Sequence, residues 1–297
     1  MSAARVTAVV VTWNRKALLL DCLEHLFAQT WPDMDILVVD NASEDGTEEA
    51  LLPLIEAGRI TYANTGANLG GAGGFQFGMR RAVEAGCEYV WIMDDDSMPE
   101  PTALEALMRA GERLGEYGWL SGKALWTDGT ICRMNVQRDL RMGNIRDYSA
   151  DHIPAGAATF VSLLIPSKVV REVGLPIKEF FIWADDLEYT RRISRKYPCW
   201  VIPGSVTVHR CRTNNGGNIS TDEASRIPRY RLAYRNEVYV YRREGARGVL
   251  RLMLRTPLHI WRVLTKSKTR KWERIKTILG GTIDGFSFRP VIVYIKK

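Results

Sequence analysis

The chain has 297 residues, and its 46% hydrophobic and 25% charged content is typical of a globular protein, which excludes a disordered or fibrous one. This length suits one large domain, or one domain with an appendage. The net charge of +7 is unevenly distributed, because residues 226–297 hold 19 Lys and Arg against 4 Asp and Glu. An acidic body thus carries a basic C-terminal region, which indicates an anionic partner, either a membrane surface or a nucleic acid.

The cysteines are odd in number and scattered, and none forms a C-x-x-C pair. They are Cys22, Cys87, Cys132, Cys199 and Cys211. This spacing argues against a disulfide framework and a zinc site, and it predicts a protein of the reducing cytoplasm. The N-terminal apolar run soon reaches Asn14, Arg15 and Lys16, so it indicates a first strand rather than a signal peptide. No run reaches the roughly 18 apolar residues that a membrane span requires.

The first 95 residues alternate between two patterns. Apolar, β-branched runs predict strands at 6–12, 34–40, 59–63 and 88–94. Amphipathic spacing predicts helices at 15–29, 47–57 and 73–86. This alternation is typical of βαβ units and a mostly parallel sheet, in which ligands bind beyond the carboxyl ends of the strands.

The pattern is more mixed from residue 100 onward. Helices are expected from about 101, at 167–173 and at 184–196, and strands at 119–126, 130–136, 157–165 and 200–208. The composition of 212–222 predicts a mobile loop. Residues 226–265 have helical spacing with dense arginine and aromatic content. We therefore expect a catalytic domain over 1–212, a mobile loop over 213–225 and a basic helical region over 226–297.

Three aspartates follow the fourth predicted strand in VWIMDDDSMPE, residues 90–100. Side chains at i and i+2 of an extended turn can face the same way, so Asp94 and Asp96 could share one ion. Carboxylate oxygens suit Mg²⁺ or Mn²⁺ and leave room for a diphosphate. The alternative is a solvated acidic loop, and the position at a strand end favours the metal.

Two further motifs and one histidine carry possible chemistry. ANLGGAGGFQFG (67–78) offers backbone amides at a helix start for an anion, or else glycines for tight helix packing. In FFIWADDLEYTRRI, Asp185 and Asp186 follow an apolar stretch that would raise a carboxyl pKa and suit a general base, or else they complement a helix dipole. His209 ends an apolar run, and it suits a metal only if other ligands are present.

Taken in order, VVTWNR, VVDNASEDGT, NLGGAGG, DDD, WADDLEY and a strand ending in histidine resemble the family 2 glycosyltransferases of GT-A fold. The resemblance covers roughly residues 5–212. The glycine stretch, the full triplet and the WADDLEY motif are most similar to bacterial galactofuranosyltransferases, and rhamnosyltransferases share much of this pattern. The implied fold is α/β, a Rossmann-like, mostly parallel sheet flanked by helices, with the basic helical region as a C-terminal extension.

The resemblance also implies roles. It assigns Asp94, Asp96 and His209 to a Mn²⁺ or Mg²⁺ ion, and Asp186 to the catalytic base with Asp185 as its neighbour. The residues implied in binding the nucleotide-sugar donor are Thr12, Asn14, Asp40, Asn41, Asn68, Gly70, Gly71, Gly73, Gly74, Asp94 and Asp95. Asp95 is expected to face the donor sugar, and Trp183 and Glu188 to lie on the acceptor side.

The implied reaction is a metal-dependent, inverting transfer from a UDP-sugar, with galactofuranose favoured, to a hydroxyl of a glycan or glycolipid. A rhamnosyl- or other hexosyltransferase, with a dTDP- or UDP-sugar, is the alternative. A nucleotidyltransferase would need a basic glycine-rich loop where this chain has TWNR. A sugar-nucleotide binding module without activity is disfavoured, because every acidic position is present.

The basic region interleaves Arg and Lys with Leu, Ile, Tyr and Trp. Basic amphipathic helices of this kind bind anionic membrane surfaces, although packed helices with solvated charges would have the same composition. No nucleic-acid-binding motif appears, so a nucleic-acid partner is disfavoured. We expect a cytoplasmic enzyme held peripherally at the inner face of the cell membrane, where lipid-linked acceptors of the family lie.

Overall fold

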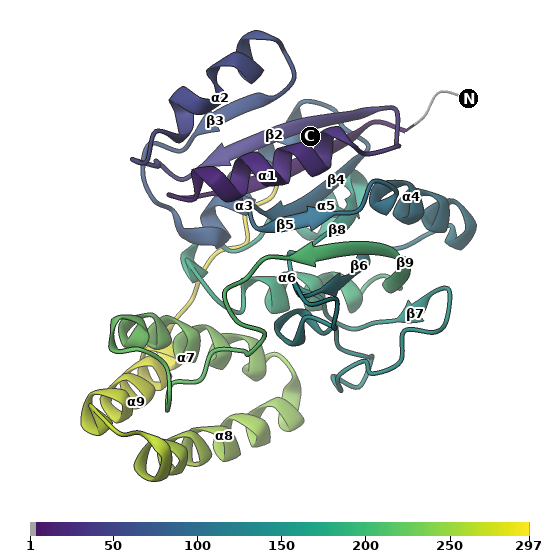
Figure 1. Ribbon diagram of the computed structural model, residues 1–297. Coiled ribbons are helices and arrows are strands. Elements are labelled where there is room, and N and C mark those ends of the chain that lie inside the picture. The colour runs from purple at the N-terminus through teal and green to yellow at the C-terminus, as the bar shows by residue number, and fades with distance from the viewer. Residues whose placement is uncertain (1–3, 297) are drawn as a thin grey trace.

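One mixed sheet runs through the body of the protein in the computed structural model, which describes residues 4–296 (Figure 1). The strand order is β3-β2-β1-β4-β8-β6-β9-β5, with β7 beside β9. The strands are β1 (Val6–Thr12), β2 (Met34–Asp40), β3 (Thr61–Asn64), β4 (Tyr89–Asp94), β5 (Ser97–Pro99), β6 (Leu120–Leu125), β7 (Ile153–Pro154), β8 (Leu163–Pro166) and β9 (Trp200–His209). The pairings make β1 to β4, β6 and β9 run one way and β5, β7 and β8 the other.

Helices cover both faces of this sheet, which explains the continuous apolar runs of its strands. Val9 and Val11 of β1 pack into one core, while Val10 packs into a second core on the opposite face. The helices are α1 (Lys16–Phe27), α2 (Thr47–Glu56), α3 (Gly70–Glu84), α4 (Ala103–Leu114), α5 (Ser167–Val173), α6 (Asp185–Ser194), α7 (Ile227–Arg242), α8 (Gly245–Lys266) and α9 (Lys271–Ser287).

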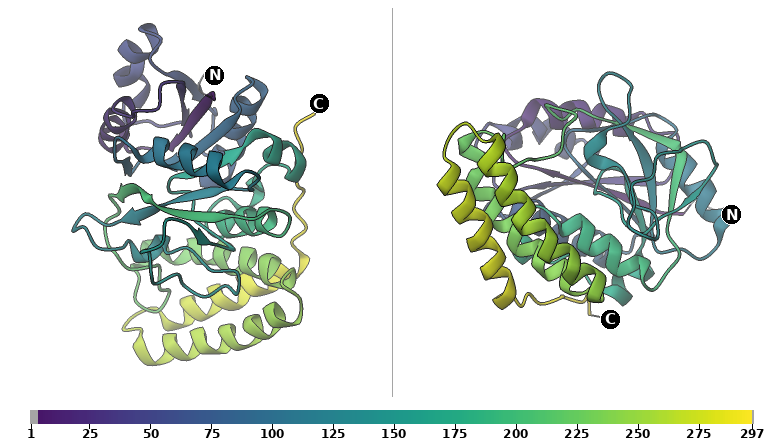
Figure 2. Two further views of the ribbon diagram at one scale, coloured as in Figure 1. Left: turned by 90° about the vertical axis from the view of Figure 1, so that its right-hand side faces the viewer. Right: turned by 90° about the horizontal axis from the view of Figure 1, so that it is seen from below.

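Helices α7, α8 and α9 form a separate layer below the sheet (Figures 1 and 2). This layer is joined to the body, because Tyr239 and Val240 of α7 share a buried apolar cluster with Ile177 and Phe180. The chain after α9 then returns along the body (Figure 2), where the backbone N–H of Leu175 donates to the carbonyl of Val293. The basic region is therefore packed on the body as well as appended to it.

Three predicted segments differ from the structure, and of the strand expected over 157–165 only the end is regular, as β8 (Leu163–Pro166). Residues 130–136 form no regular strand but a tight turn with a 3₁₀ segment, Arg133–Asn135, because Cys132 and Asn135 turn inward to contact His209. The end of the expected mobile loop is anchored, since Ile219 and Ser220 are buried and Ser267 donates to the carbonyl of Ser220 at 2.6 Å.

None of the helices described within residues 4–296 combines the length and the apolar character needed to cross a bilayer.

Candidate active site

The aspartate triplet lies where β1 and β4 end side by side, with Val11 of β1 opposite Asp94. Asp95 and Asp96 are buried, and Asp94 lies in the wall of a cavity of about 810 Å³. The hydroxyl of Thr12, the last residue of β1, donates to Asp95 at 2.7 Å. Polar side chains from the ends of β1 and β4 thus meet at this edge of the sheet.

A strand that the sequence did not predict brings His209 to the triplet. The chain reverses after Asp96 into β5, which pairs with β9 so that Ser97 lies opposite His209. His209 then approaches Asp96 with Nε2 at 3.0 Å from Oδ1 and Asn135 with Nδ1 at 2.7 Å from Oδ1. Although burial opposes it, the Asp96 contact raises the pKa of His209 to about 12, while His209 and Arg15 hold the pKa of Asp96 at about 2 against its burial.

Arg15 is the one strong cation at the triplet that sequence reasoning did not assign. Its guanidinium spans two carboxylates, with Nη2 2.9 Å from Asp95 Oδ1 and Nη1 2.6 Å from Asp96 Oδ2. The only signal in the sequence was its place at the end of VVTWNR. Asp94 has no ion pair among residues 4–296, and burial with repulsion from Asp96 raises its pKa to about 7.

The triplet therefore has more negative charge than its neighbours neutralise. Burial also raises the pKa of Asp95 to about 7 in spite of Arg15. Asp94 and Asp96 offer carboxylate oxygens, and His209 offers an imidazole once it has lost its proton, and these donor types suit Mn²⁺ or Mg²⁺. Among residues 4–296, the ligand atoms that lie within 4.8 Å of one another are those of Cys132, His209 and Cys211. The repulsion at Asp94 is what a divalent cation would relieve, so the donor types at the triplet fit such an ion.

The pair Asp185–Asp186 opens α6 after a strained turn that lies against the same cavity. Phe181, Trp183 and Ala184 all have positive φ, near +62° to +66°, which is uncommon for residues with a Cβ. Such conformations persist only where the surrounding structure imposes them, and they cluster at functional sites.

Asn236 of α7 holds this turn in place. Its side-chain amide is fully buried and lies 2.9 to 3.1 Å from the carbonyls of Phe180, Ile182 and Trp183. Sequence reasoning missed this residue, because one asparagine in a basic helix carries no pattern. A helix assigned to the extension thus positions the turn before the expected base.

Asp186 has the properties of a base. Burial raises its pKa to about 6, even though its carboxylate accepts the backbone N–H of Leu187 at 2.6 Å. Burial and the neighbouring Asp186 raise the pKa of Asp185 well above its usual range. Both acids also lie in the first turn of α6, where the helix dipole favours negative charge. The two interpretations of this motif are therefore compatible.

Some residues of the glycine loop are glycine because of close packing, and others leave space at the cavity. A side chain at Gly70, whose φ is +70°, would lie 2.1 Å from the carbonyl of Phe181. Side chains at Gly73 and Gly74 would collide with Leu69 and with Val11 of β1. Gly71 has open space in front of it and lines the cavity. The glycines at 73 and 74 are thus explained by close packing, and Gly70 and Gly71 face the candidate site.

The other expected donor residues divide into two groups. Thr12, Asn14, Asn41 and Asn68 line the cavity. Asp40 is buried behind them, where its two oxygens accept the N–H of Ser43 and the hydroxyl of Tyr62, each at 2.8 Å. Asp40 therefore orders the loop after β2.

The two residues expected on the acceptor side also differ. Trp183 lines the cavity, whereas Glu188 does not. Glu188 is buried and forms two hydrogen bonds with Arg192, at 3.0 and 2.8 Å. Its position one turn inside α6 directs it to Arg192, so we correct the expectation for Glu188 to a structural role.

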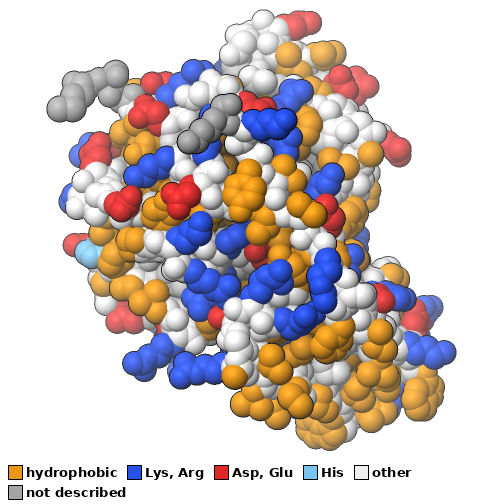
Figure 3. Space-filling view, turned by 180° about the vertical axis from the view of Figure 1, so that it is seen from behind, with side chains coloured by type: hydrophobic (Ala, Val, Ile, Leu, Met, Phe, Trp, Pro, Cys, Tyr) orange, Lys and Arg blue, Asp and Glu red, His pale blue; other side chains and the backbone are white. Residues whose placement is uncertain are grey.

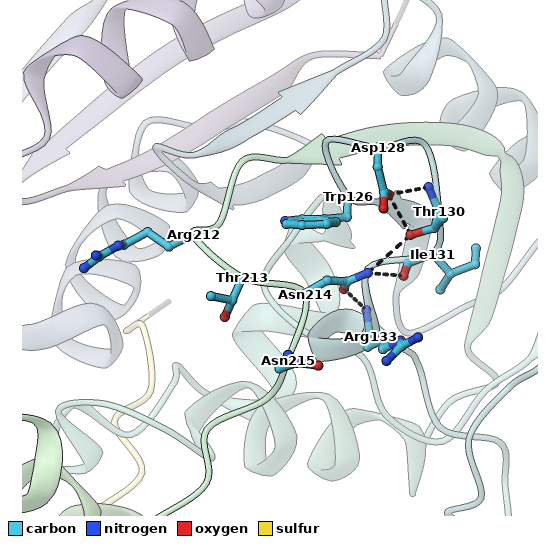
Figure 4. Close-up of a pocket in the computed structure, with 9 residues that line it drawn as sticks. All are labelled: Trp126, Asp128, Thr130, Ile131, Arg133, Arg212, Thr213, Asn214 and Asn215. Carbon is cyan, nitrogen blue, oxygen red and sulfur yellow. Dashed lines mark hydrogen bonds between the residues drawn. The ribbon is translucent and has the colours of Figure 1, made fainter. Parts of the chain in front are cut away.

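Two cysteines distant in sequence meet behind His209. Cys132 and Cys211 lie 3.9 Å apart at their Sγ atoms, and one nitrogen of His209 is within 4.8 Å of both. The scattered spacing of the cysteines gave no sign of this contact. Beyond it, a second hollow of about 610 Å³ lies between Trp126 and residues 212–215 (Figure 4). In that hollow the side-chain amide of Asn214 donates to the carbonyl of Ile131 at 3.1 Å. This bond joins the segment after β9 to the turn that contains Ile131.

Comparison with known proteins supports one family. Residues 7–121 match the family model described as glycosyl transferase family 2. The chain is 28% identical over 266 residues to galactofuranosyltransferase GlfT1 of Mycolicibacterium smegmatis, covering 82% of this chain and 85% of that relative.

Solved structures agree on the fold. GalNAc-T7 with UDP, GalNAc and Mn²⁺ is similar with a TM-score of 0.67 at 14% identity, over 93% of this chain and 54% of that one. A mannosyltransferase from Pyrobaculum calidifontis, in complex with GDP-Man and Mn²⁺, is similar with a TM-score of 0.60 at 15% identity, over 96% of this chain and 88% of that one. Both are GT-A glycosyltransferases, and the predicted fold class is confirmed.

Proposed function

We propose that this chain is a family 2 glycosyltransferase of the GT-A fold, which transfers galactofuranose from a UDP-sugar to a hydroxyl of a glycan acceptor with inversion. The observation that carries the proposal is a single cavity that both Asp94 and Asp186 line. That cavity offers acids for a metal and diphosphate together with a base, and Asp186 is near enough to add to the repulsion at Asp94. The similarity to a galactofuranosyltransferase supports the choice of sugar.

The proposed reaction is a direct displacement. Asp186 takes the proton of the acceptor hydroxyl, whose oxygen bonds to the anomeric carbon while the bond from that carbon to the diphosphate breaks. A carboxyl with a pKa of about 6 is ionised at neutral pH and is a stronger base than an ordinary aspartate. One base suffices, because the nucleotide diphosphate leaves without a proton.

We propose that Asp94, Asp96 and His209 hold Mn²⁺ or Mg²⁺. A bound divalent cation neutralises charge that develops on the leaving diphosphate, as a Lewis acid. Arg15 keeps Asp95 and Asp96 fixed on the side of the triplet that faces α1. Two structures of similar fold were solved with Mn²⁺, which supports a divalent ion in this one.

The proposed donor site uses the polar residues at the strand ends. Thr12, Asn14 and Asn41 line the cavity near the triplet and suit the nucleoside, with Asp40 ordering the loop behind them. Asn68, Gly70 and Gly71 line the cavity at the start of α3, where the backbone N–H of Gly71 suits the diphosphate and sugar. The N–H of Gly70 donates to the Asn68 side chain at 2.8 Å. Asp95 accepts from Thr12 and Arg15, so in this structure it supports the site from behind.

We also propose that the enzyme works at an anionic membrane surface and takes a lipid-linked acceptor. Large apolar side chains of α8 and α9 are exposed together, among them Met253 and Trp272, which are 69% and 74% exposed. Figure 3 shows this apolar face with Lys and Arg side chains bordering it. Apolar side chains bordered by cations match the chemistry of a membrane interface.

A panel of UDP- and dTDP-sugars, with Mn²⁺, Mg²⁺ or EDTA, tests the catalytic proposal through release of the nucleotide diphosphate. We expect release from UDP-galactofuranose with metal, faster when a lipid-linked glycan is added. Release from dTDP-rhamnose alone would overturn the choice of sugar in favour of the alternative. Absence of release from every donor would overturn the proposed reaction.

A further inference from the structure

An arginine-rich groove of about 560 Å³ runs along one side of α8, outside the catalytic cavity. Arg247, Arg251 and Arg255 follow each other at four-residue intervals, so they share one face of the helix. Arg138 closes the groove from the opposite loop, and Arg262 lies at its end. A parallel row of apolar side chains lines the same groove: Leu250, Leu254 and Leu258.

Four of the five groove arginines have no ion pair within residues 4–296. Within residues 4–296, Arg255 is the groove arginine that forms an ion pair, with Glu237 at 2.7 Å. Partial burial and then repulsion from Arg251 and Arg255 lower the pKa of Arg138. Clustered, partly desolvated guanidinium groups with few carboxylates are a binding site for an anion, and arginine is suited to phosphate in particular.

The groove connects to the catalytic cavity through shared walls. A middle cavity of about 450 Å³ shares Arg255, His259 and Arg262 with the groove. The same middle cavity shares Trp183 and Ala184 with the cavity that holds Asp186. Three adjoining hollows therefore lie between the arginines of α8 and the proposed base.

The lining of the middle cavity suits sugar rings. Trp183 and Tyr230 lie with ring centroids 4.8 Å apart, and Tyr234 is next to them in the same wall. The hydroxyl of Tyr234 is 2.6 Å from His259 Nδ1, and Glu237 supplies a carboxylate. Aromatic faces with a few polar groups bind polar ligands that also have an apolar face.

We propose that the groove binds the phosphate-bearing headgroup of a lipid-linked acceptor, with the start of its hydrocarbon chain along Leu250, Leu254 and Leu258. The glycan would cross the middle cavity and present its hydroxyl to Asp186. This inference rests on the proposed glycosyltransfer to a lipid-linked acceptor. The argument combines phosphate chemistry at the arginines with an apolar row beside them, which a soluble sugar phosphate would leave uncovered.

Calorimetric binding of farnesyl diphosphate to the full-length protein tests the proposal without any turnover. We expect farnesyl diphosphate to bind more tightly than inorganic pyrophosphate or farnesol. The double variant Arg247→Gln/Arg251→Gln should weaken this binding about tenfold, because two charge-assisted contacts to phosphate are lost. Both arginines are exposed, so these substitutions spare the core.

The matched control is Lys268→Gln/Lys276→Gln, which removes the same charge from exposed positions outside the groove. Equal weakening by both double variants would overturn the groove in favour of general charge attraction. Binding of farnesyl diphosphate no tighter than that of pyrophosphate would overturn the role of the leucines. Full competition by phosphatidylglycerol vesicles would assign the groove to bulk membrane lipid, against the proposal. Donor turnover by the wild type is measured separately, so failure of the proposed reaction is distinguishable.

Discussion

The two ends of this molecule carry charge in opposite ways. At the edge of the sheet, acids are buried, and two of the three aspartates are held by charged partners, as Asp96 is by Arg15 and His209. In the layer of α7 to α9, cations are mostly exposed, and Arg247 and Arg251 have no ion pair within residues 4–296. Buried acids held in one geometry suit a catalytic site, whereas exposed cations suit the binding of an anionic partner. Asn236 links the two ends, because it lies on α7 in the helical layer and its side chain holds the turn before Asp185 and Asp186.

Replacing the proposed base should give the largest effect and test the sheet edge directly. Asp186→Asn should lower the transfer rate about 10³-fold, since a general base supplies roughly that factor. UDP affinity, measured by calorimetry, should stay near the wild-type value. Asp185→Asn is the control, and a greater loss of rate with that variant would reverse the two roles. Loss of UDP binding by Asp186→Asn would contradict its role as a base.

Removing the link between the two ends should have the next largest effect. Asn236→Ala removes the two N–H protons that three carbonyls of the strained turn share, and a buried group left unsatisfied costs about 1–3 kcal/mol. The carbonyl of Phe180 keeps the backbone N–H of Ile182. We expect kcat to fall about 30-fold with little change in KM for the donor. The exposed Asn215→Ala serves as the control. An unchanged kcat in a folded Asn236→Ala protein would show that the turn before Asp186 keeps its conformation without Asn236.

The pH dependence of the free energy of unfolding tests whether the aspartate triplet has more negative charge than its neighbours neutralise. In the folded protein the pKa of Asp94 is raised to about 7, from 3.8 in the unfolded chain. Between about pH 4 and about pH 7 the folded state keeps a proton on Asp94 that the unfolded state has lost. The free energy of unfolding is therefore highest at low pH and falls as pH rises toward 7. In urea unfolding without metal, we expect the free energy of unfolding to fall by on the order of 1–2 kcal/mol between about pH 5 and about pH 7.5.

Asp94→Asn should reduce that dependence, because its side chain does not titrate, while Asp95 and Asp186, whose pKa values are also raised, keep part of it. Mn²⁺ should stabilise the wild type more at the higher pH, where Asp94 is ionised, and should stabilise the variant less. A wild type that becomes steadily more stable as pH rises through this window would contradict the assignment. Equal stabilisation of both proteins by Mn²⁺ would place the ion elsewhere.

The smallest expected effect concerns the exposed face of the helical layer. Trp261 and Trp272 are 57% and 74% exposed on α8 and α9. Trp261→Ser/Trp272→Ser should weaken binding to anionic vesicles about fivefold in a sedimentation assay, because part of their apolar area no longer enters the interface. Leu52→Ser, on α2 at the other end of the molecule, should change nothing. Equal vesicle binding by the wild type and both variants would show that charge alone attracts the protein to the membrane, without insertion of the tryptophans.

The sequence predicted the parallel half of the fold well because local pattern decides it. Strands β1 and β2 are continuous apolar runs buried on both faces, and their bounds agree with the prediction. Strand β5 was missed, since three residues acquire strand geometry only through pairing with β9. Its absence from the prediction also hid how His209 reaches Asp96.

The candidate site divides in the same way. Acids directly after strands were found from position, and the cavity brings Asp94 and Asp186 together. Glu188 is instead paired with Arg192, and their four-residue spacing within the helix predicted over 184–196 was a signal that could have indicated this pair. Arg15 and Asn236 were missed for a different reason: an arginine or asparagine gains its meaning from partners more than 50 residues away.

The carbonyl of Phe181 has a consequence for the kinetics of this enzyme. It accepts the backbone N–H of Ala72 at 3.2 Å and leaves no room for a side chain at Gly70. One peptide group is thus a common wall between the loop proposed for the donor and the turn that precedes the base. A nucleotide sugar that moves the start of α3 must also move the turn beside the acceptor. We therefore expect an ordered mechanism, in which the donor adds first and the acceptor's affinity depends on it.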